Sequence, residues 1–282
     1  MGLIEQEKNE DIWDLKSGDN TIKCKVDKKN GFNVFHQSSF SPKNFDNYEE
    51  IMYKCFSKFY SNDYKIIIIE DNNGGGLSEL CAPFTQYVRP KILKPFHSSM
   101  KSTNLTYKWW KFKSWNIYPF TEKNDPFSEG ITDIYNDGID QVIHKRTKDI
   151  EFLNIFERKI MEKKRREYLM TGKTKKPTEI IVFTDGYSFS CTSFFIKGLQ
   201  EHGHAIIVVY NSKPGLEKSD FDAAQSSSSV ETFKYSEKVQ NLNKLGFNVR
   251  VTFGEKFDHN DKGNPKTPEE FLIYPVDYIS PI

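Results

Sequence analysis

Ser190 lies where a run of apolar residues ends and a helical pattern begins. Residues 180–183 (IIVF) predict a buried strand and residues 184–189 (TDGYSF) a turn, and apolar residues recur at helical spacing from Cys191 onward. A helix N-terminus presents free N–H groups and the positive end of the helix dipole. A hydroxyl group there has donors beside it that could stabilise an oxyanion. Serine is also a common N-cap residue, and the spacing alone favours that structural role.

A second, glycine-rich turn favours a catalytic role for Ser190 over the capping role. Residues 71–76 (DNNGGG) follow the apolar run of residues 66–69 (IIII), which reads as a strand covered on both faces. Three successive glycines allow backbone N–H groups to point into a site. If the two strands are neighbours, both turns open at the same carboxyl edge of the sheet. Together they would supply a nucleophile and an oxyanion hole, whereas neither turn matches a phosphate-binding loop.

The remaining elements predict an α/β fold with a largely parallel sheet flanked by helices, because buried strands alternate with helices. A hairpin with an Asn30-Gly31 turn is expected near the start. The predicted strands are residues 20–26, 31–37, 66–69, 180–183, 205–210 and 247–253, with an edge strand at 271–276, and the predicted helices are residues 46–61, 77–87, 149–170, 191–202 and 230–245.

The chain divides into a polar N-terminal segment (1–19) and one core domain (20–282), which carries an irregular, aromatic-rich insertion at 89–148. The stretch YKWWKFKSW (107–115) could stack on nucleic acid or lie at a membrane interface. The formal net charge of only +1 favours packing of these aromatics on the core instead. We therefore expect no nucleic-acid partner, and no apolar run is long enough to span a membrane.

The composition is that of a soluble globular protein, with 37% hydrophobic and 28% charged residues among 282. The four cysteines, Cys24, Cys55, Cys81 and Cys191, show no metal-ligand spacing and are expected to be buried free thiols. A partial calcium-loop pattern at 258–263 is better explained as a surface turn. No metal or organic cofactor is expected, and the sequence predicts neither compartment nor oligomeric state.

Three segments occur in an order that resembles the tail-specific (C-terminal-processing) serine protease family. They are GFNVFHQSSFSPKNFDNYEEI (31–51), IIIIEDNNGGGLSEL (66–80) and IIVFTDGYSFSCTSFFIKGLQEHGHAIIVVY (180–210). They are similar to the family blocks "GYIxIxxF", "IDLRxNxGG" and "GxxSASASEIFAxxLQD". TDGYSFSCTSFF is closer to the "TDGxCSSTCAxF" form of a divergent eukaryotic branch. The resemblance covers about residues 20–280, with no evident PDZ module.

This resemblance implies a ClpP/crotonase-like core and a serine endopeptidase that hydrolyses extended polypeptides through an acyl-enzyme. Ser190 matches the family nucleophile. The backbone N–H of Cys191 and that of Gly74 or Gly75 would form the oxyanion hole. In the members that use a lysine base, the base follows the third strand, where this chain has Lys213 about two residues early.

The departures from the family pattern leave the general base open. Ile69 and Asp71 replace the family's Asp and Arg, Ser193 replaces a Glu, and Gly215 falls on the position of the lysine. His36 reads as a strand residue, and His202 and His204 flank a helix end where a cation suits the dipole. No motif surrounds the remaining histidines, which are His97, His144 and His259. The alternative is a catalytically inactive protein of the same fold that binds peptide or another ligand.

Overall fold

The computed structural model describes residues 12–89, 96–108, 131–136, 141–146, 174–210, 215, 217–220, 230–232, 237–247, 250–252, 254–258 and 268–280. The predicted helix at 149–170, the tryptophan-rich stretch from residue 109 onward and Lys213 lie outside these residues. In the described part of the chain, no helix is both long and apolar enough to cross a membrane.

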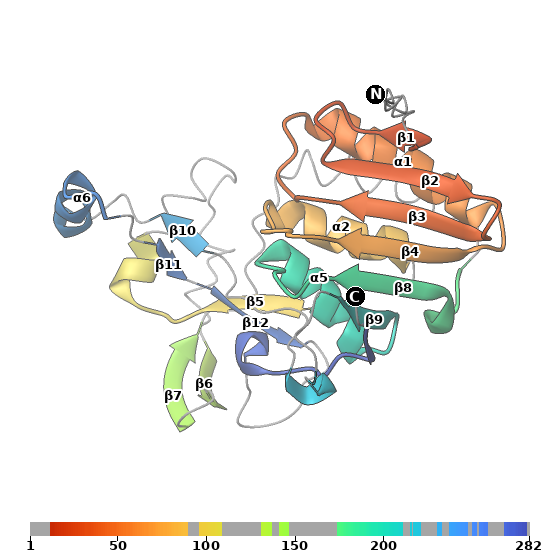
Figure 1. The fold of residues 1–282 in the computed structure, drawn as a ribbon. Helices are drawn as coiled ribbons and strands as arrows, with labels where there is room; N and C mark the ends of the chain where they lie inside the picture. Colours follow the sequence, from red (N-terminus) through yellow and green to blue (C-terminus); the bar gives the residue numbers. More distant parts are fainter. Residues whose placement is uncertain are drawn as a thin grey trace, which may run out of the picture.

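A seven-stranded sheet forms the centre of the molecule, in the order β1-β2-β3-β4-β8-β9-β13 (Figure 1). The pairs β1–β2 and β2–β3 are antiparallel, and every pair from β3 to β13 is parallel. Its strands are Leu15–Lys16 (β1), Ile22–Asp27 (β2), Phe32–Gln37 (β3), Lys65–Glu70 (β4), Ile180–Thr184 (β8), Ile206–Val209 (β9) and Tyr278–Ile279 (β13). The expected α/β class with a mostly parallel sheet is therefore confirmed.

Three helices pack against one face of this sheet: Phe45–Tyr60 (α1), Ser78–Val88 (α2) and Cys191–Glu201 (α5). The ring of Phe84 in α2 lies 4.4 Å from that of Phe195 in α5 and 5.3 Å from that of Phe35 in β3, measured between centroids. All three rings are fully buried, and burial of each side chain stabilises the fold by about 2 kcal/mol. This contact fixes the two helices that begin at the two turns relative to one another.

The opposite face of the sheet is less covered than the apolar run of β4 predicts. Ile66 and Ile68 are fully buried beneath the helices, whereas Ile67 and Ile69 on the other face are partly exposed. The strand alternates in burial because helices α1, α2 and α5 all lie on one side, as a sheet with one covered face does.

The first hairpin and helix form as the sequence predicts. Gly31 has φ 72°, and its N–H donates to the carbonyl of Asp27, which closes the turn between β2 and β3. At the start of α1, the side chain of Asn44 accepts a hydrogen bond from the N–H of Asn47 at 3.0 Å. This is an ordinary side-chain N-cap, with extended backbone at Asn44 (φ −130°).

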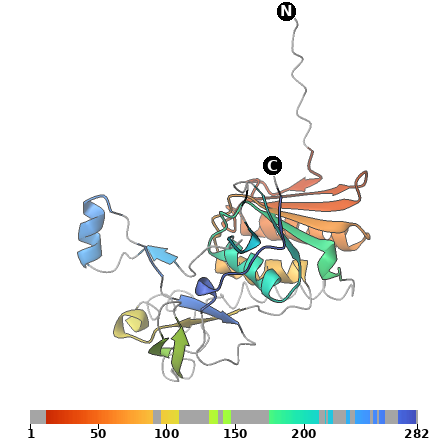
Figure 2. The same cartoon turned by 60° about the horizontal axis from the view of Figure 1, so that its bottom comes forward.

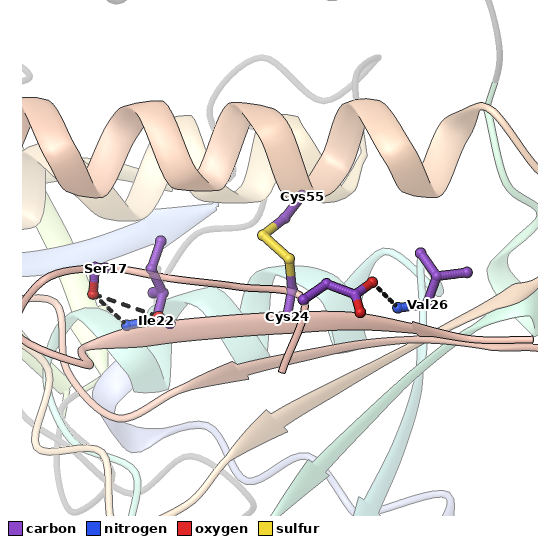
Figure 3. The surroundings of a disulfide bond; sticks show 6 residues. Ser17, Ile22, Cys24, Val26 and Cys55 are labelled. Atoms are coloured by element: carbon purple, nitrogen blue, oxygen red, sulfur yellow. Dashed lines mark hydrogen bonds between the residues drawn. A yellow bond between two sulfur atoms is a disulfide. The ribbon is translucent and has the colours of Figure 1, made fainter. Parts of the chain in front are cut away.

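A disulfide joins Cys24 of β2 to Cys55 of α1 (Figure 3), with the Cα atoms 6.1 Å apart. The expectation of free thiols is therefore wrong for this pair. Their spacing of 31 residues matches no disulfide motif, and the two sulfurs meet only because α1 packs across β2. Cys81 and Cys191 are buried thiols that form no disulfide, as expected.

Shorter strand pairs lie to one side of the main sheet in both views (Figures 1 and 2). They are Phe96–Met100 (β5) with Gly254–Asp258 (β12), Ile131–Asn136 (β6) with Gln141–Arg146 (β7), and Val230–Thr232 (β10) with Arg250–Thr252 (β11), beside the helix Glu237–Lys244 (α6). The predicted insertion thus contains regular strands where it is described. The predicted helix at 230–245 begins seven residues late, after β10.

The predicted edge strand at 271–276 is wrong. The short 3-10 helix Glu269–Phe271 (η4) starts this segment, and the edge strand is β13, which pairs in parallel with β9. Gln200 of α5 donates its amide to the carbonyls of Tyr274 and Pro275. The carbonyls that a strand would pair with a neighbouring strand are thus bonded to the helix instead.

Candidate active site

The turns after β4 and β8 lie side by side at one edge of the sheet. Strands β4 and β8 are parallel neighbours, and the last pair in their register is Glu70 with Thr184. The turns are bonded to each other as well: the N–H of Phe189 donates to the carbonyl of Asn73 at 3.1 Å, and that of Asn72 to Asp185 Oδ2 at 2.8 Å. The two turns that the sequence singled out therefore form one surface.

Ser190 does not behave as a capping serine. Its backbone has φ 53° and ψ −118°, far from the extended conformation of an ordinary N-cap, and its side chain makes no capping hydrogen bond. Among the described residues, the other non-glycine residues with positive φ are Asn20 and Asn72, and asparagine tolerates this region better than serine. A strained, half-buried serine between a strand and a helix is typical of a nucleophile.

Gly75 of the first turn lies directly against Ser190. A Cβ atom placed on Gly75 would lie 2.4 Å from the carbonyl oxygen of Phe189, 2.8 Å from Ser190 Cβ and 2.9 Å from the backbone nitrogen of Cys191. Gly75 also has φ 83°, which an L side chain rarely adopts. Only glycine allows the first turn to approach the second this closely.

The backbone donors of the first turn are not equivalent. The N–H of Gly75 donates to Asn73 Oδ1 at 3.0 Å, so it is already engaged. Gly74 is exposed, and its N–H donates to none of the described residues. Of the two glycines predicted as oxyanion donors, the structure therefore leaves Gly74 available. Cys191, the other predicted donor, begins α5 directly after Ser190.

A buried polar network supports the first turn from below. Glu70, at the end of β4, accepts a hydrogen bond from Asn73 Nδ2 at 2.6 Å, and the same nitrogen donates to the carbonyl of Gln37 at 3.3 Å. Both Glu70 and Asn73 have an exposed fraction of 0%. Burial raises the pKa of the Glu70 carboxyl well above its ordinary value, and the nearby Cys81 raises it further, against the lowering effect of the Asn73 bond. These conditions favour a neutral carboxylic acid.

The second turn is held by hydroxyl groups. The side chains of Thr184 and Ser188 share a buried hydrogen bond of 3.0 Å, and the N–H of Gly186 donates to Thr184 Oγ1 at 3.1 Å. The N–H of Tyr187 donates to Asp185 Oδ1. These bonds fold residues 184–188 tightly enough to bring Ser190 to the start of α5.

The outer rim of the site combines negative charge with apolar side chains. Burial, and then hydrogen bonding to Asp71, raise the pKa of Tyr210, which follows β9 at this edge. Tyr210 is therefore a neutral phenol beside carboxylates. The exposed large apolar residues nearest to Ser190 in the chain are Tyr187 (75% exposed) and Phe189 (37%).

His36, His202 and His204 lie outside the two turns. His36 lies in β3, on the sheet face opposite the helices, with its ring 6.0 Å from that of Trp13. His202 caps the far end of α5 from Ser190. Burial and the charge of Arg89 lower the pKa of His204, which disfavours the cation expected at that helix end. Lys213, the predicted base, lies outside the described residues.

Sequence reasoning missed Glu70 and Asn73. A glutamate that ends a run of four isoleucines was the available signal, because an acidic residue at the end of a buried strand needs a hydrogen-bond partner. Within the described ranges, no group of three or more histidine, cysteine, aspartate or glutamate side chains is arranged to hold a metal ion.

No protein-family model matches this sequence, and none of the curated proteins matches it. Solved structures that match this chain include a candidate peptidase from Parabacteroides merdae (14% identity, 96% of this chain, 59% of that chain, TM-score 0.42). Mature CPAF (16% identity, 94% and 48%, TM-score 0.46) and the photosystem II D1 C-terminal processing protease (8% identity, 88% and 42%, TM-score 0.39) are others. This chain spans about half the length of these structures. Likeness at this level of identity assigns no activity to it.

Proposed function

We propose that this protein is a serine endopeptidase that cleaves extended polypeptides through an acyl-enzyme on Ser190. One observation carries the proposal: Ser190 adopts a strained backbone conformation and packs against Gly75 of the neighbouring turn. A serine placed in this way presents a hydroxyl group beside backbone N–H donors. The α/β core would be of the ClpP/crotonase-like type, and the chain a divergent, eukaryotic-type relative of the tail-specific proteases.

In the proposed reaction, Ser190 Oγ attacks the peptide carbonyl carbon and gives its proton to a general base. The N–H groups of Cys191 and Gly74 bind the oxygen as it becomes negative. The C–N bond then breaks, the amine leaves with the proton, and water hydrolyses the ester to release the acid and restore the serine. We assign the base to Lys213, three residues after Tyr210 in the sequence. A lysine in this role needs a pKa lowered by burial.

A polypeptide substrate is favoured by the residues around the serine. The aromatic side chains of Tyr187 and Phe189 are exposed and close to Ser190 in the chain, so we expect them to provide apolar contact to substrate side chains. No cofactor is required, because the nucleophile and the oxyanion donors all come from the chain.

Labelling with a fluorophosphonate probe tests the proposal. We expect labelling of the wild-type protein, complete loss in Ser190→Ala, and parallel loss of hydrolysis of a denatured polypeptide. Ser193→Ala is the matched control, because this serine is on the same helix but is 1% exposed. Lys213→Ala should abolish labelling if this lysine is the base. A folded wild-type protein that is not labelled would refute the enzymatic proposal and favour the non-catalytic binding protein.

A further inference from the structure

Asn73 connects four parts of the candidate site. Its Nδ2 group donates to Glu70 Oε2 and to the carbonyl of Gln37, and its Oδ1 accepts from the N–H of Gly75. Its backbone carbonyl accepts from the N–H of Phe189 in the second turn. The end of β3, the end of β4 and both turns therefore meet at one residue, which is fully buried.

Glu70 and Gln37 together determine which way the Asn73 amide faces. An amide has a donor end and an acceptor end. The Nδ2 end donates to Glu70 Oε2 and to the carbonyl of Gln37, which can only accept, and so Oδ1 is turned toward Gly75. The Asn73–Glu70 bond is the shortest of these, at 2.6 Å. In the described part of the chain, Glu70 Oε1 has no hydrogen-bond partner, so Glu70 makes its side-chain contact through Oε2 alone.

This orientation has a consequence for the oxyanion donors. The N–H of Gly75 is bonded to Asn73, which holds Gly75 at the position where it touches Ser190. The N–H of the preceding residue, Gly74, is left available. Loss of the acceptor at position 70 would remove the shorter of the two hydrogen bonds of Asn73 Nδ2 and leave the 3.3 Å bond to Gln37, so the amide that holds the Gly75 N–H would be less firmly fixed.

We propose that Glu70 and Asn73 are positioning residues for the Ser190 site, in which the buried Glu70 carboxyl orients the Asn73 amide and so fixes the glycine turn against the nucleophile. The role in catalysis rests on the proposed peptidase function, whereas the effect on the turn can be measured without it. Neither residue contacts substrate in this scheme.

Burial favours the neutral form of Glu70, which accepts the hydrogen bond from Asn73. Its buried surroundings include the Cys81 thiol of α2 and the Tyr48 hydroxyl of α1. Burial raises the pKa of Glu70 above its ordinary value of 4.5, so the folded state holds this proton more tightly than the unfolded state. The resulting stabilisation is fully present below the ordinary value and is lost as pH rises through the folded value. We therefore expect wild type to lose stability relative to Glu70→Gln as pH rises above about 5.

The decisive variants are Glu70→Gln and Glu70→Met. Glutamine keeps a neutral hydrogen-bond acceptor, whereas methionine keeps the approximate size of the side chain but removes the acceptor. We expect Glu70→Gln to react with the fluorophosphonate probe at close to the wild-type rate. Glu70→Met should react about 10- to 100-fold more slowly, because small displacements of a reacting group cost rates of this order. Glu49→Met is the matched control, since Glu49 is another buried glutamate, 2% exposed, on α1.

Hydrogen exchange of the Gly75 amide, followed by NMR, provides a readout that does not depend on activity. Protection should persist in Glu70→Gln and Glu49→Met and fall in Glu70→Met. If the wild type is never labelled but this pattern holds, the peptidase proposal fails and the positioning of the turn stands. Equal protection in all folded variants, or a Glu70→Gln variant as impaired as Glu70→Met, would overturn the inference.

Discussion

The units β4–α2 and β8–α5 have the same architecture but stabilise their turns in different ways. Each consists of a parallel strand, a short turn and an 11-residue helix, and neither helix has a side-chain cap at its N-cap residue, Leu77 or Ser190. Helix α1, by contrast, is capped by Asn44. The helices at the candidate site therefore begin without the usual local stabilisation, which is common where helix N-termini serve a site.

The two turns differ in the residue that takes up the unusual backbone where they touch. On the side of the first turn it is Gly75, whose N–H is held by the buried Asn73 side chain, and the other positive φ angles of this turn lie at Asn72 and Gly76. On the side of the second turn, which also has a positive φ at Gly186, it is Ser190, whose conformation carries a cost that a glycine would avoid. The difference indicates a division of roles, in which one turn provides space and backbone donors while the other provides the side chain.

The largest expected effect on stability is that of removing the Cys24–Cys55 disulfide, which tests whether the geometry of the two turns is independent of overall stability. Replacing both Cys24 and Cys55 with alanine should lower the free energy of unfolding by about 3 kcal/mol, because the unfolded chain gains freedom. Strand β2 is two positions from β4 in the sheet, so the probe reaction of the folded variant should be unchanged. Urea denaturation and labelling at low denaturant measure the two quantities. A folded double variant that is no longer labelled would show that the turns are not an independent unit.

Gly75→Ala should produce the next largest effect, because it attacks the contact between the turns. The new Cβ would clash with the Phe189 carbonyl and with Ser190, at a φ of 83° that alanine disfavours. We expect a loss of about 2–3 kcal/mol in the free energy of unfolding and loss of labelling.

Substitutions at two other glycines distinguish the two causes of the Gly75→Ala effect, which are the backbone conformation and the steric clash. Gly203 has φ 59° and open space around it, so Gly203→Ala should cost about 1 kcal/mol from the backbone conformation alone. Gly74 has neither a positive φ nor a neighbour within 4 Å, so the stability of Gly74→Ala should change by about 0.5 kcal/mol or less. A Gly75→Ala variant no less stable than Gly203→Ala would refute the close contact between the turns.

The sequence predicts features that depend on local patterns but not those that depend on packing. Buried strands and amphipathic helices depend on local patterns, and the elements from β2 to α2 and from β8 to β9 lie within a few residues of their predicted bounds. The meeting of the two turns required only that β4 and β8 be neighbours. The Cys24–Cys55 disulfide and the Asn73 network depend on side chains brought together by packing, which a single sequence does not encode in any local pattern.

A smaller effect than that of Gly75→Ala is expected at Ser190 itself and tests whether its backbone is strained. Ser190→Ala and Ser190→Gly both remove the hydroxyl group, so both should be unlabelled, but only glycine relieves the conformation with φ 53° and ψ −118°. Glycine also makes the unfolded chain more flexible, which offsets part of the gain. We expect Ser190→Gly to be more stable than Ser190→Ala by about 1 kcal/mol in urea denaturation.

The same pair of substitutions at Ser38 supplies the reference for this comparison. Ser38 has no positive φ, so Ser38→Gly should be less stable than Ser38→Ala by about 0.5–1 kcal/mol. The sign of the glycine–alanine difference should therefore reverse between the two serines. If the sign is the same at both positions, Ser190 carries no strain, and the reason for reading it as a nucleophile rather than a capping residue is lost. A reversal would mean that the fold maintains an unfavourable serine conformation at the point where the two turns meet.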